Sequence, residues 1–252
     1  MKNLPRLLLI LALVAATSCG ARTGEKANPK PTQKTTFAEE TTTTTEGTSL
    51  NKNLGPALIS AANRGDAEYV RLLLEQGADV EARDDAERTP IIAAAYGNHL
   101  EVARLLVEAG ANVNAKDETV QSAYLISTSE VGDDPRLLHL TLKNGADVKS
   151  LDSYEGTGLI RAAERGYPRV IDRLLETNID VDHINNLQWT ALLEAIILGD
   201  GGSSHIEVVR LLIQKGNADP NLPDGNGVTP LQHARQNGYT EIERILERAG
   251  AK

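Results

Sequence analysis

Residues 89–115 read TPIIAAAYGNHLEVARLLVEAGANVNA, and this stretch decides the fold. Thr89 suits the N-cap of a helix, and Pro90 suits the first helical position, where a missing N–H costs nothing. Three successive alanines follow, and a second apolar run over residues 100–107 ends at Gly110. Glycine can adopt the left-handed conformation that terminates a helix. The stretch therefore predicts two short helices joined by a tight turn.

One such hairpin cannot bury its own apolar face, so it needs copies beside it, and Leu105 and Leu106 are expected to lie between stacked copies. The chain contains these copies at a period of about 33 residues. The residues expected to cap the first helix of each unit are Pro56, Thr89, Ser122, Thr157, Thr190 and Thr229. An acidic or amide residue stands five positions before the cap in most units, at Asp84, Asp117, Asp152, Asn185 and Asp224.

The period, the starts and the ends of these units together resemble the ankyrin repeat. The starts TPII at Thr89–Ile92 and TPLQ at Thr229–Gln232 are similar to the TPLH of that family. The ends GADV at Gly77–Val80 and GANVNA at Gly110–Ala115 match as well. The resemblance covers about six units in residues 54–252 and implies an all-α repeat solenoid, an array of helix hairpins with β-hairpin-like finger turns.

The composition agrees with a thin aliphatic core. Aromatic residues make up only 3% of the chain and hydrophobic residues 40%, so the core must consist of Leu, Ile, Val and Ala. The sequence contains none of the common catalytic motifs, neither HExxH, GxSxG nor a P-loop, and its five histidines are scattered over separate units. We therefore expect no enzyme, no cofactor and no metal site.

The N-terminus has the pattern of a secretory signal peptide over residues 1–18. Lys2 and Arg6 precede an apolar run over residues 7–16, and small residues lead to Cys19, the single cysteine of the chain. Residues 16–19 resemble a bacterial lipobox, which implies that Cys19 is lipidated and becomes the new N-terminus. The alternative is ordinary signal cleavage at the same bond, which would leave a soluble periplasmic protein.

The residues after Cys19 predict where the folded part is held. Residues 19–53 comprise the lipidated N-terminus and a tether rich in Thr, Lys and Pro that has almost nothing to bury. Gly20 follows the cysteine, and it is not the Asp that typically retains lipoproteins at the inner membrane of enteric bacteria. The expected location is therefore the outer membrane, on its periplasmic side, with the lipid as the only membrane contact.

Charge limits the class of partner. The whole chain carries −9; the signal segment accounts for +2 and the tether for +1, which leaves −12 on residues 54–252. Such an array would repel the phosphates of nucleic acid, and it favours a basic protein partner approached by electrostatic steering. We expect the protein itself to be a monomer.

The resemblance also implies where a partner binds, because ankyrin repeats differ from one another at the finger tips and on the exposed inner-helix face. Tyr96, Tyr154 and Trp189 are the expected aromatic anchors, since binding energy concentrates in large aromatic residues and Arg. Tyr154 and Trp189 are expected to form one patch from consecutive fingers. The other candidate positions are Asp85, Arg88, Glu118, Gln121, Glu130, Glu164, Arg165, Asn186, Leu198, Asn226 and Gln236.

Three roles remain open on the sequence. The first is an immunity protein that neutralises a toxin delivered to the periplasm, such as a lipase effector. The second is a periplasmic stress-protection scaffold. The third is an unrecognised hydrolase built on the insertions of the third and fifth units.

Overall fold

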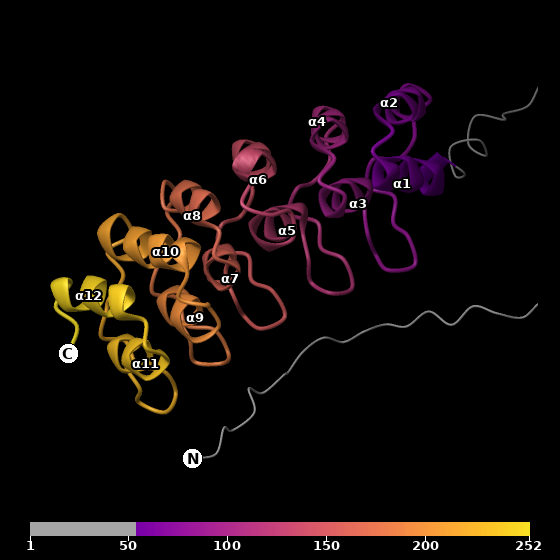
Figure 1. The fold of residues 1–252 in the computed structure, drawn as a ribbon. Helices are drawn as coiled ribbons and strands as arrows, with labels where there is room; N and C mark the ends of the chain where they lie inside the picture. Colours follow the sequence, from indigo (N-terminus) through magenta and orange to yellow (C-terminus); the bar gives the residue numbers. More distant parts are fainter. Residues whose placement is uncertain (1–53) are drawn as a thin grey trace, which may run out of the picture. The chain divides into compact units, whose positions relative to one another are not determined.

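A computed structural model describes residues 54–252, and the predicted signal peptide, Cys19 and the tether lie outside the described residues. The described part consists of helices joined by turns (Figure 1). The helices are α1 (Leu54–Arg64), α2 (Ala67–Glu75), α3 (Pro90–Tyr96), α4 (Leu100–Glu108), α5 (Ala123–Ser129), α6 (Pro135–Lys143), α7 (Gly158–Arg165), α8 (Pro168–Leu174), α9 (Ala191–Ile197), α10 (Ser203–Gln214), α11 (Pro230–Asn237) and α12 (Thr240–Arg248). No strand occurs in residues 54–252, which confirms an all-α repeat array.

The helices form two layers (Figure 1). The odd-numbered helices are the inner row and the even-numbered helices the outer row, and each inner helix forms a hairpin with the outer helix that follows it. Between hairpins the chain leaves the stack and returns, which makes five fingers that project on the side of the inner helices. We number the fingers by the unit they lead into: two (76–89), three (109–122), four (144–157), five (175–190) and six (215–229).

The predicted cap residues begin the inner helices, with two corrections. The side-chain oxygens of Ser122, Thr157, Thr190 and Thr229 accept hydrogen bonds from the backbone N–H three residues on, at 3.2–3.4 Å. Thr89 occupies the same position, but its buried hydroxyl makes no capping bond. Pro56 was expected to be a cap, yet it is the third residue of α1, which begins at Leu54. A proline is tolerated there because the first turn of a helix has no acceptors for its N–H groups.

The core lies between the stacked hairpins and is aliphatic, as the composition predicts. Leu106 of α4 is fully buried, whereas Leu105 is only partly buried at the edge of the cluster. The expectation of burial between units is thus confirmed for Leu106 alone. Every residue of α5 is buried, including Ser127 and Thr128, whose hydroxyls donate to the carbonyls of Tyr124 and Leu125 at 2.6 and 2.7 Å. Because these bonds satisfy the buried hydroxyl groups, a helix with polar side chains can be buried between apolar neighbours.

Side chains near the turn within the hairpin tie units two, five and six to the unit before each of them. His99 Nε2 lies 3.2 Å from the carbonyl oxygen of Asn63, near the end of α1. His205 Nε2 lies at the same distance from the carbonyl oxygen of Glu164. Asn237 donates from Nδ2 to the carbonyl of Ile196 at 3.2 Å. His99 therefore has a structural role, as a contact between the first two units.

The turn between α5 and α6 is ordered by two acids. The carboxylates of Asp133 and Asp134 both act as helix caps. Asp134 caps α6 by accepting from the N–H of Arg136 at 3.1 Å. Asp133 reaches into the next unit, where its Oδ1 accepts from the N–H groups of Arg169 and Val170 at 2.8 and 3.0 Å.

No helix within residues 54–252 is both long and apolar enough to cross a bilayer; the longest, α10, has 12 residues.

Candidate functional site

Each finger is organised by the residue five positions before the cap. In finger four, Asp152 Oδ1 accepts from the N–H groups of Tyr154 and Gly156, both at 2.8 Å. Asn185 does the same in finger five for Leu187 and Trp189, both at 3.0 Å. Asp84, Asp117 and Asp224 repeat this pattern in the remaining fingers. The carboxylate or amide thus replaces backbone partners and holds the tip residues in a fixed arrangement.

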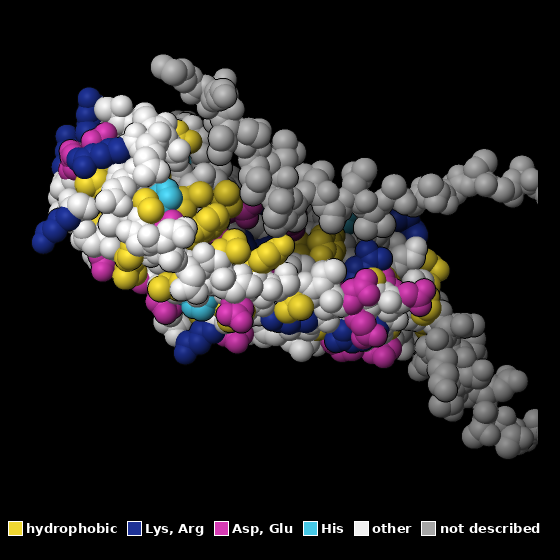
Figure 2. Space-filling model, turned by 90° about the horizontal axis from the view of Figure 1, so that it is seen from below, with side chains coloured by type: hydrophobic (Ala, Val, Ile, Leu, Met, Phe, Trp, Pro, Cys, Tyr) yellow, Lys and Arg dark blue, Asp and Glu magenta, His cyan; other side chains and the backbone are white. Residues whose placement is uncertain are grey.

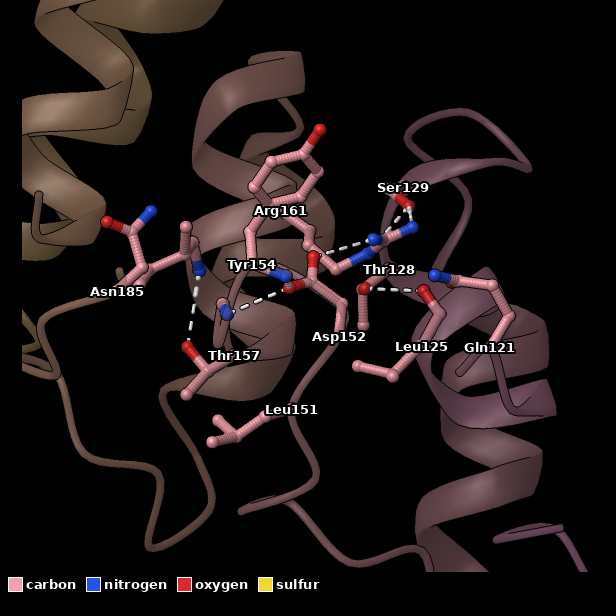
Figure 3. A network of polar contacts seen from close by, with 12 residues as sticks. Gln121, Leu125, Thr128, Ser129, Leu151, Asp152, Tyr154, Thr157, Arg161 and Asn185 are labelled. Carbon is pink, nitrogen blue, oxygen red and sulfur yellow. Dashed lines mark hydrogen bonds and ion pairs between the residues drawn. The ribbon is translucent and has the colours of Figure 1, made fainter. Parts of the chain in front are cut away.

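In fingers three, four and six the second oxygen of the same residue binds an inner-helix side chain, and this partner changes from unit to unit. In unit four, Arg161 Nη1 donates to Asp152 Oδ2 at 2.9 Å. The same guanidinium donates to Ser129 Oγ at 3.0 Å and to Glu130 Oε1 at 3.1 Å, both in unit three (Figure 3). In unit six, His233 Nε2 lies 3.0 Å from Asp224 Oδ2. The polar network therefore joins fingers to inner helices and, at Arg161, one unit to its neighbour.

In unit five the acidic side chain of this pair lies on the inner helix and not on the finger. Asn185 stands in place of the aspartate, and Glu194 of α9 stands at the position of Arg161 and His233. Asn185 donates from Nδ2 to Glu194 Oε1 at 2.8 Å, while Glu194 Oε2 is buried without a partner among the described residues. The side chain is only 4% exposed. Burial, followed by the nearby charge of Glu164, raises the pKa of Glu194 to about 7.

Fingers four and five touch at their tips. The backbone N–H of Asn186 donates to the carbonyl of Tyr154 at 3.0 Å, and His183 Nε2 lies 2.7 Å from the carbonyl oxygen of Glu155. Three large hydrophobic side chains are exposed at this junction: Tyr154 by 42%, Ile184 by 45% and Leu187 by 46%. We call these three residues the tip patch. Figure 2 looks onto the finger side and shows hydrophobic side chains along this face.

The expected anchors differ in exposure and surroundings. Tyr154 is exposed at the tip, and its neighbour across the junction is Asn186, as consecutive fingers require. Trp189 is partly buried, and its backbone N–H donates to Asn185 Oδ1 within finger five. Tyr96 is 40% exposed, but it lies at the end of α3, where its hydroxyl donates to Asp117 Oδ2 at 3.2 Å.

The other candidate positions divide by exposure. Arg88, Gln121 and Glu164 are partly buried, and Arg88 is bound to Asp84 Oδ2 at 2.9 Å within its own finger. The remaining candidates are exposed: Asp85, Glu118, Glu130, Arg165, Asn186, Leu198, Asn226 and Gln236. They follow the whole row of fingers and inner helices, so only those in units four and five lie near the tip patch.

Ile184 and Leu187 are absent from the expected set, although the sequence contains a signal for Leu187. The position of Leu187 in finger five is occupied by the small or polar Ala86, Thr119 and Asn226 in fingers two, three and six, and by Tyr154 in finger four. A large apolar residue at a solvent-facing tip position departs from that pattern. Comparing the fingers position by position would therefore have found it.

Nothing in the described residues is assembled for metal chemistry. Residues 54–252 contain no group of three or more His, Cys, Asp or Glu side chains close enough to hold a metal ion. Asp224, in the sequence DGNG, instead accepts backbone N–H bonds and organises finger six.

The period, the paired helices and the fingers are shared with known proteins. The sequence model described as "Ankyrin repeats (3 copies)" matches residues 39–117 and 125–224. The chain belongs to the ankyrin repeat family. Ankyrin repeats typically mediate protein–protein interaction, so a protein-binding face is the expected kind of site here.

Individual ankyrin proteins are similar over most of the chain. The putative ankyrin repeat protein YahD of Escherichia coli K12 is 37% identical over 201 residues, which cover 79% of this chain and 98% of that protein. The solved ankyrin repeat domain from Acinetobacter baumannii AYE is 45% identical, with a TM-score of 0.73 and coverage of 78% and 98%. The solved ankyrin repeat protein EF0377 is 34% identical, with a TM-score of 0.71 and coverage of 77% and 98%.

Proposed function

We propose that this protein binds another protein through its finger tips and inner-helix face, with the tip patch of Tyr154, Ile184 and Leu187 as the anchor. In this proposal, lipid on Cys19 holds the chain at the outer membrane, and the array faces the periplasm. The observation that carries the proposal is the exposure of three large hydrophobic side chains at the contact between two rigid fingers.

The tip patch suits an interface because its backbone is already ordered. Asp152 and Asn185 fix the two tips by hydrogen bonds, and the Asn186–Tyr154 bond joins them. A partner would therefore lose little free energy in ordering this surface, and it would remove exposed apolar area from water. Clustered exposed hydrophobic residues of this kind typically mark interaction sites.

The charges around the tip patch favour a basic partner. Glu155 flanks the patch, and Glu118 and Asp85 continue the exposed row toward finger two. With −12 on residues 54–252, the face would accelerate association with a cationic protein and slow association with acidic surfaces. An immunity protein for a basic toxin would have these properties, and so would a scaffold for another basic periplasmic protein.

Site-specific photo-crosslinking tests the proposal. A benzophenone amino acid at Leu187 reports on the tip patch, and the same residue at Leu72 is the matched control, because Leu72 is also 46% exposed but belongs to the outer helix α2. We expect one discrete crosslinked protein from the Leu187 probe in cells and none from the Leu72 probe. Crosslinks from Leu72 alone, or from neither probe, would contradict the proposed face.

A further inference from the structure

A sizeable cleft lies on the outer helices, away from the finger face. It is a cleft of about 820 Å³ lined by residues of α4, α6, α8 and α10. The outer helices form their own row in Figure 1, on the side opposite the fingers. In this row α8 has only seven residues, between α6 with nine and α10 with twelve.

Basic groups are the most frequent members of the cleft wall. They are Arg104, Arg136, His139, Arg169 and Arg173. Three acids are also present, and each is paired: Asp172 and Glu207 with cations outside the lining, and Glu176 with Arg173 of the cleft wall and with Lys215. Lys215 Nζ lies 2.6 Å from Asp172 Oδ1 and 3.7 Å from Glu176 Oε1. Glu207 pairs with Arg210 within α10.

Of the four arginines in the cleft wall, Arg104 and Arg169 have no acid partner among residues 54–252, whereas Arg136 Nη2 lies 2.6 Å from Asp134 Oδ2. Arg104 makes neither a hydrogen bond nor an ion pair among residues 54–252, and the guanidinium of Arg169 donates only to the carbonyl of Asp133, at 3.2 Å. Arg173 pairs with Glu176, but its Nε is buried and has no acceptor among the described residues. Leaving such a buried donor unpaired costs free energy, which a bound acceptor would recover.

The rest of the lining is apolar. Pro135 and Pro168 open α6 and α8, so pyrrolidine rings stand where backbone N–H groups would otherwise face the cleft, and Leu211 of α10 completes this surface. A ligand for the cleft therefore needs an anionic group with several acceptor oxygens beside an apolar part. Arginine forks match phosphate in geometry and in charge.

We propose that the cleft between α4 and α10 binds a phosphate group carrying an apolar substituent, with Arg104, Arg169 and Arg173 as the phosphate ligands. Either a soluble phosphate monoester or the headgroup of an anionic phospholipid has this chemistry. The site is independent of the finger face, so loss of either function would leave the other intact.

Binding assays on the full chain test the site with two probes. Phenyl phosphate, followed by calorimetry, represents the soluble source, and vesicles of phosphatidylglycerol, compared with phosphatidylcholine, represent the membrane source. The test variant is Arg104→Ala with Arg169→Ala. The matched control is Arg71→Ala with Arg244→Ala, two exposed arginines on the outer helices α2 and α12.

We expect the test variant to weaken binding of at least one probe by about tenfold or more, because hydrogen bonds to charged groups are lost, and the control variant to leave it unchanged. Arginine-dependent binding of phenyl phosphate alone would identify a soluble ligand, and arginine-dependent binding of the anionic vesicles alone a lipid. Equal losses in both variants would show diffuse charge attraction and overturn the proposal. So would failure of the wild-type chain to bind either probe.

Discussion

At the scale of single residues, the buried polar groups that lack a hydrogen-bond partner mark the positions where burial costs free energy. Glu194 Oε2 and the Tyr124 hydroxyl are both buried and unpaired among the described residues. Burial raises the pKa of Tyr124 well above its usual range, so the phenol stays neutral. Glu194 is different, because its pKa of about 7 lies within the range of ordinary experiments.

Glu194 should make stability fall with rising pH. The folded state holds the Glu194 proton up to about pH 7, whereas the unfolded state loses it near the ordinary value of 4.5. Between these values the folded state binds more protons, so the free energy of unfolding decreases across the window, by up to about 3 kcal/mol in total. Glu194→Gln should remove this loss and make the protein more stable than wild type at pH 8. Urea unfolding at pH 5 and pH 8 measures the effect.

The control for Glu194 is Glu108→Gln, an exposed acid of α4, which should leave the pH dependence of stability unchanged. If Glu194→Gln and wild type lose the same free energy of unfolding between pH 5 and pH 8, Glu194 titrates at its ordinary pKa in the folded protein.

Gly158, at the start of α7, lies so close to the side chain of Tyr124 that a larger residue would clash with it. A Cβ atom at Gly158 would lie 2.7 Å from the Tyr124 hydroxyl oxygen and 2.9 Å from Thr128 Cγ2. Gly158→Ala should therefore destabilise the fold by about 1–3 kcal/mol through overpacking. In a Tyr124→Phe background the cost should be smaller, because the closest atom is gone. Urea unfolding of the four proteins gives the coupling energy, and a coupling of zero would mean that another contact limits the site.

At the scale of elements, each helix pair is stabilised by what it buries against its neighbours. The helices of the described region run from seven to twelve residues, which is too short for stability in isolation. Their stability therefore comes from packing between units, and residues on the same helix should differ in importance according to the side they face.

Leu105 and Leu106 are adjacent in α4, and they test this directly. Leu106 is fully buried and Leu105 is not. Leu106→Ala should cost about 2–5 kcal/mol of unfolding free energy through lost burial and a cavity, and Leu105→Ala clearly less. Each substitution is the control for the other, since helix propensity changes equally in both. Equal costs in urea unfolding would mean that both side chains face the stack.

In the fingers, one residue adopts a backbone conformation that is unfavourable for its residue type. The residue two before the cap has a positive φ in every finger: 58° at Glu87, 65° at Val120, 59° at Glu155 and 63° at Gln188. Only finger six has a glycine there, Gly227 with a φ of 80°. The Asx bonds of each finger hold this conformation against its cost, which is largest for the β-branched Val120.

At the scale of the whole molecule, repetition made the fold predictable. The Thr-Pro starts and the 33-residue period determined the hairpins, and the recurring acid before each cap was enough to locate the fingers. Side-chain pairing across units was not predictable, because it depends on which residues stacking brings together. The reversed pair of Asn185 and Glu194, the reach of Asp133 into α8 and the cleft above the short α8 all arise in this way.

The predicted lipid anchor, which would attach the whole molecule to the membrane, lies outside the described residues. If lipid on Cys19 is the only membrane attachment, Cys19→Ser should move the protein from the membrane fraction to the soluble fraction, because the acyl chains supply the apolar area that inserts into the bilayer. The measurement is cell fractionation with immunodetection. Cys19→Ala is the second variant, and mass spectrometry of the wild-type chain reports the modification itself. An unmodified Cys19 in the mature protein would refute the lipoprotein prediction.

The ties from His99, His205 and Asn237 to the preceding units also determine how the array should respond to a pulling force. Each tie joins a unit only to its neighbour, so a load applied at the two ends cannot be shared across the array. The terminal unit should release first, then the next, each freeing about 33 residues and adding roughly 100 Å of slack chain. A single-molecule extension trace would then show a row of evenly spaced force drops, in place of one large rupture.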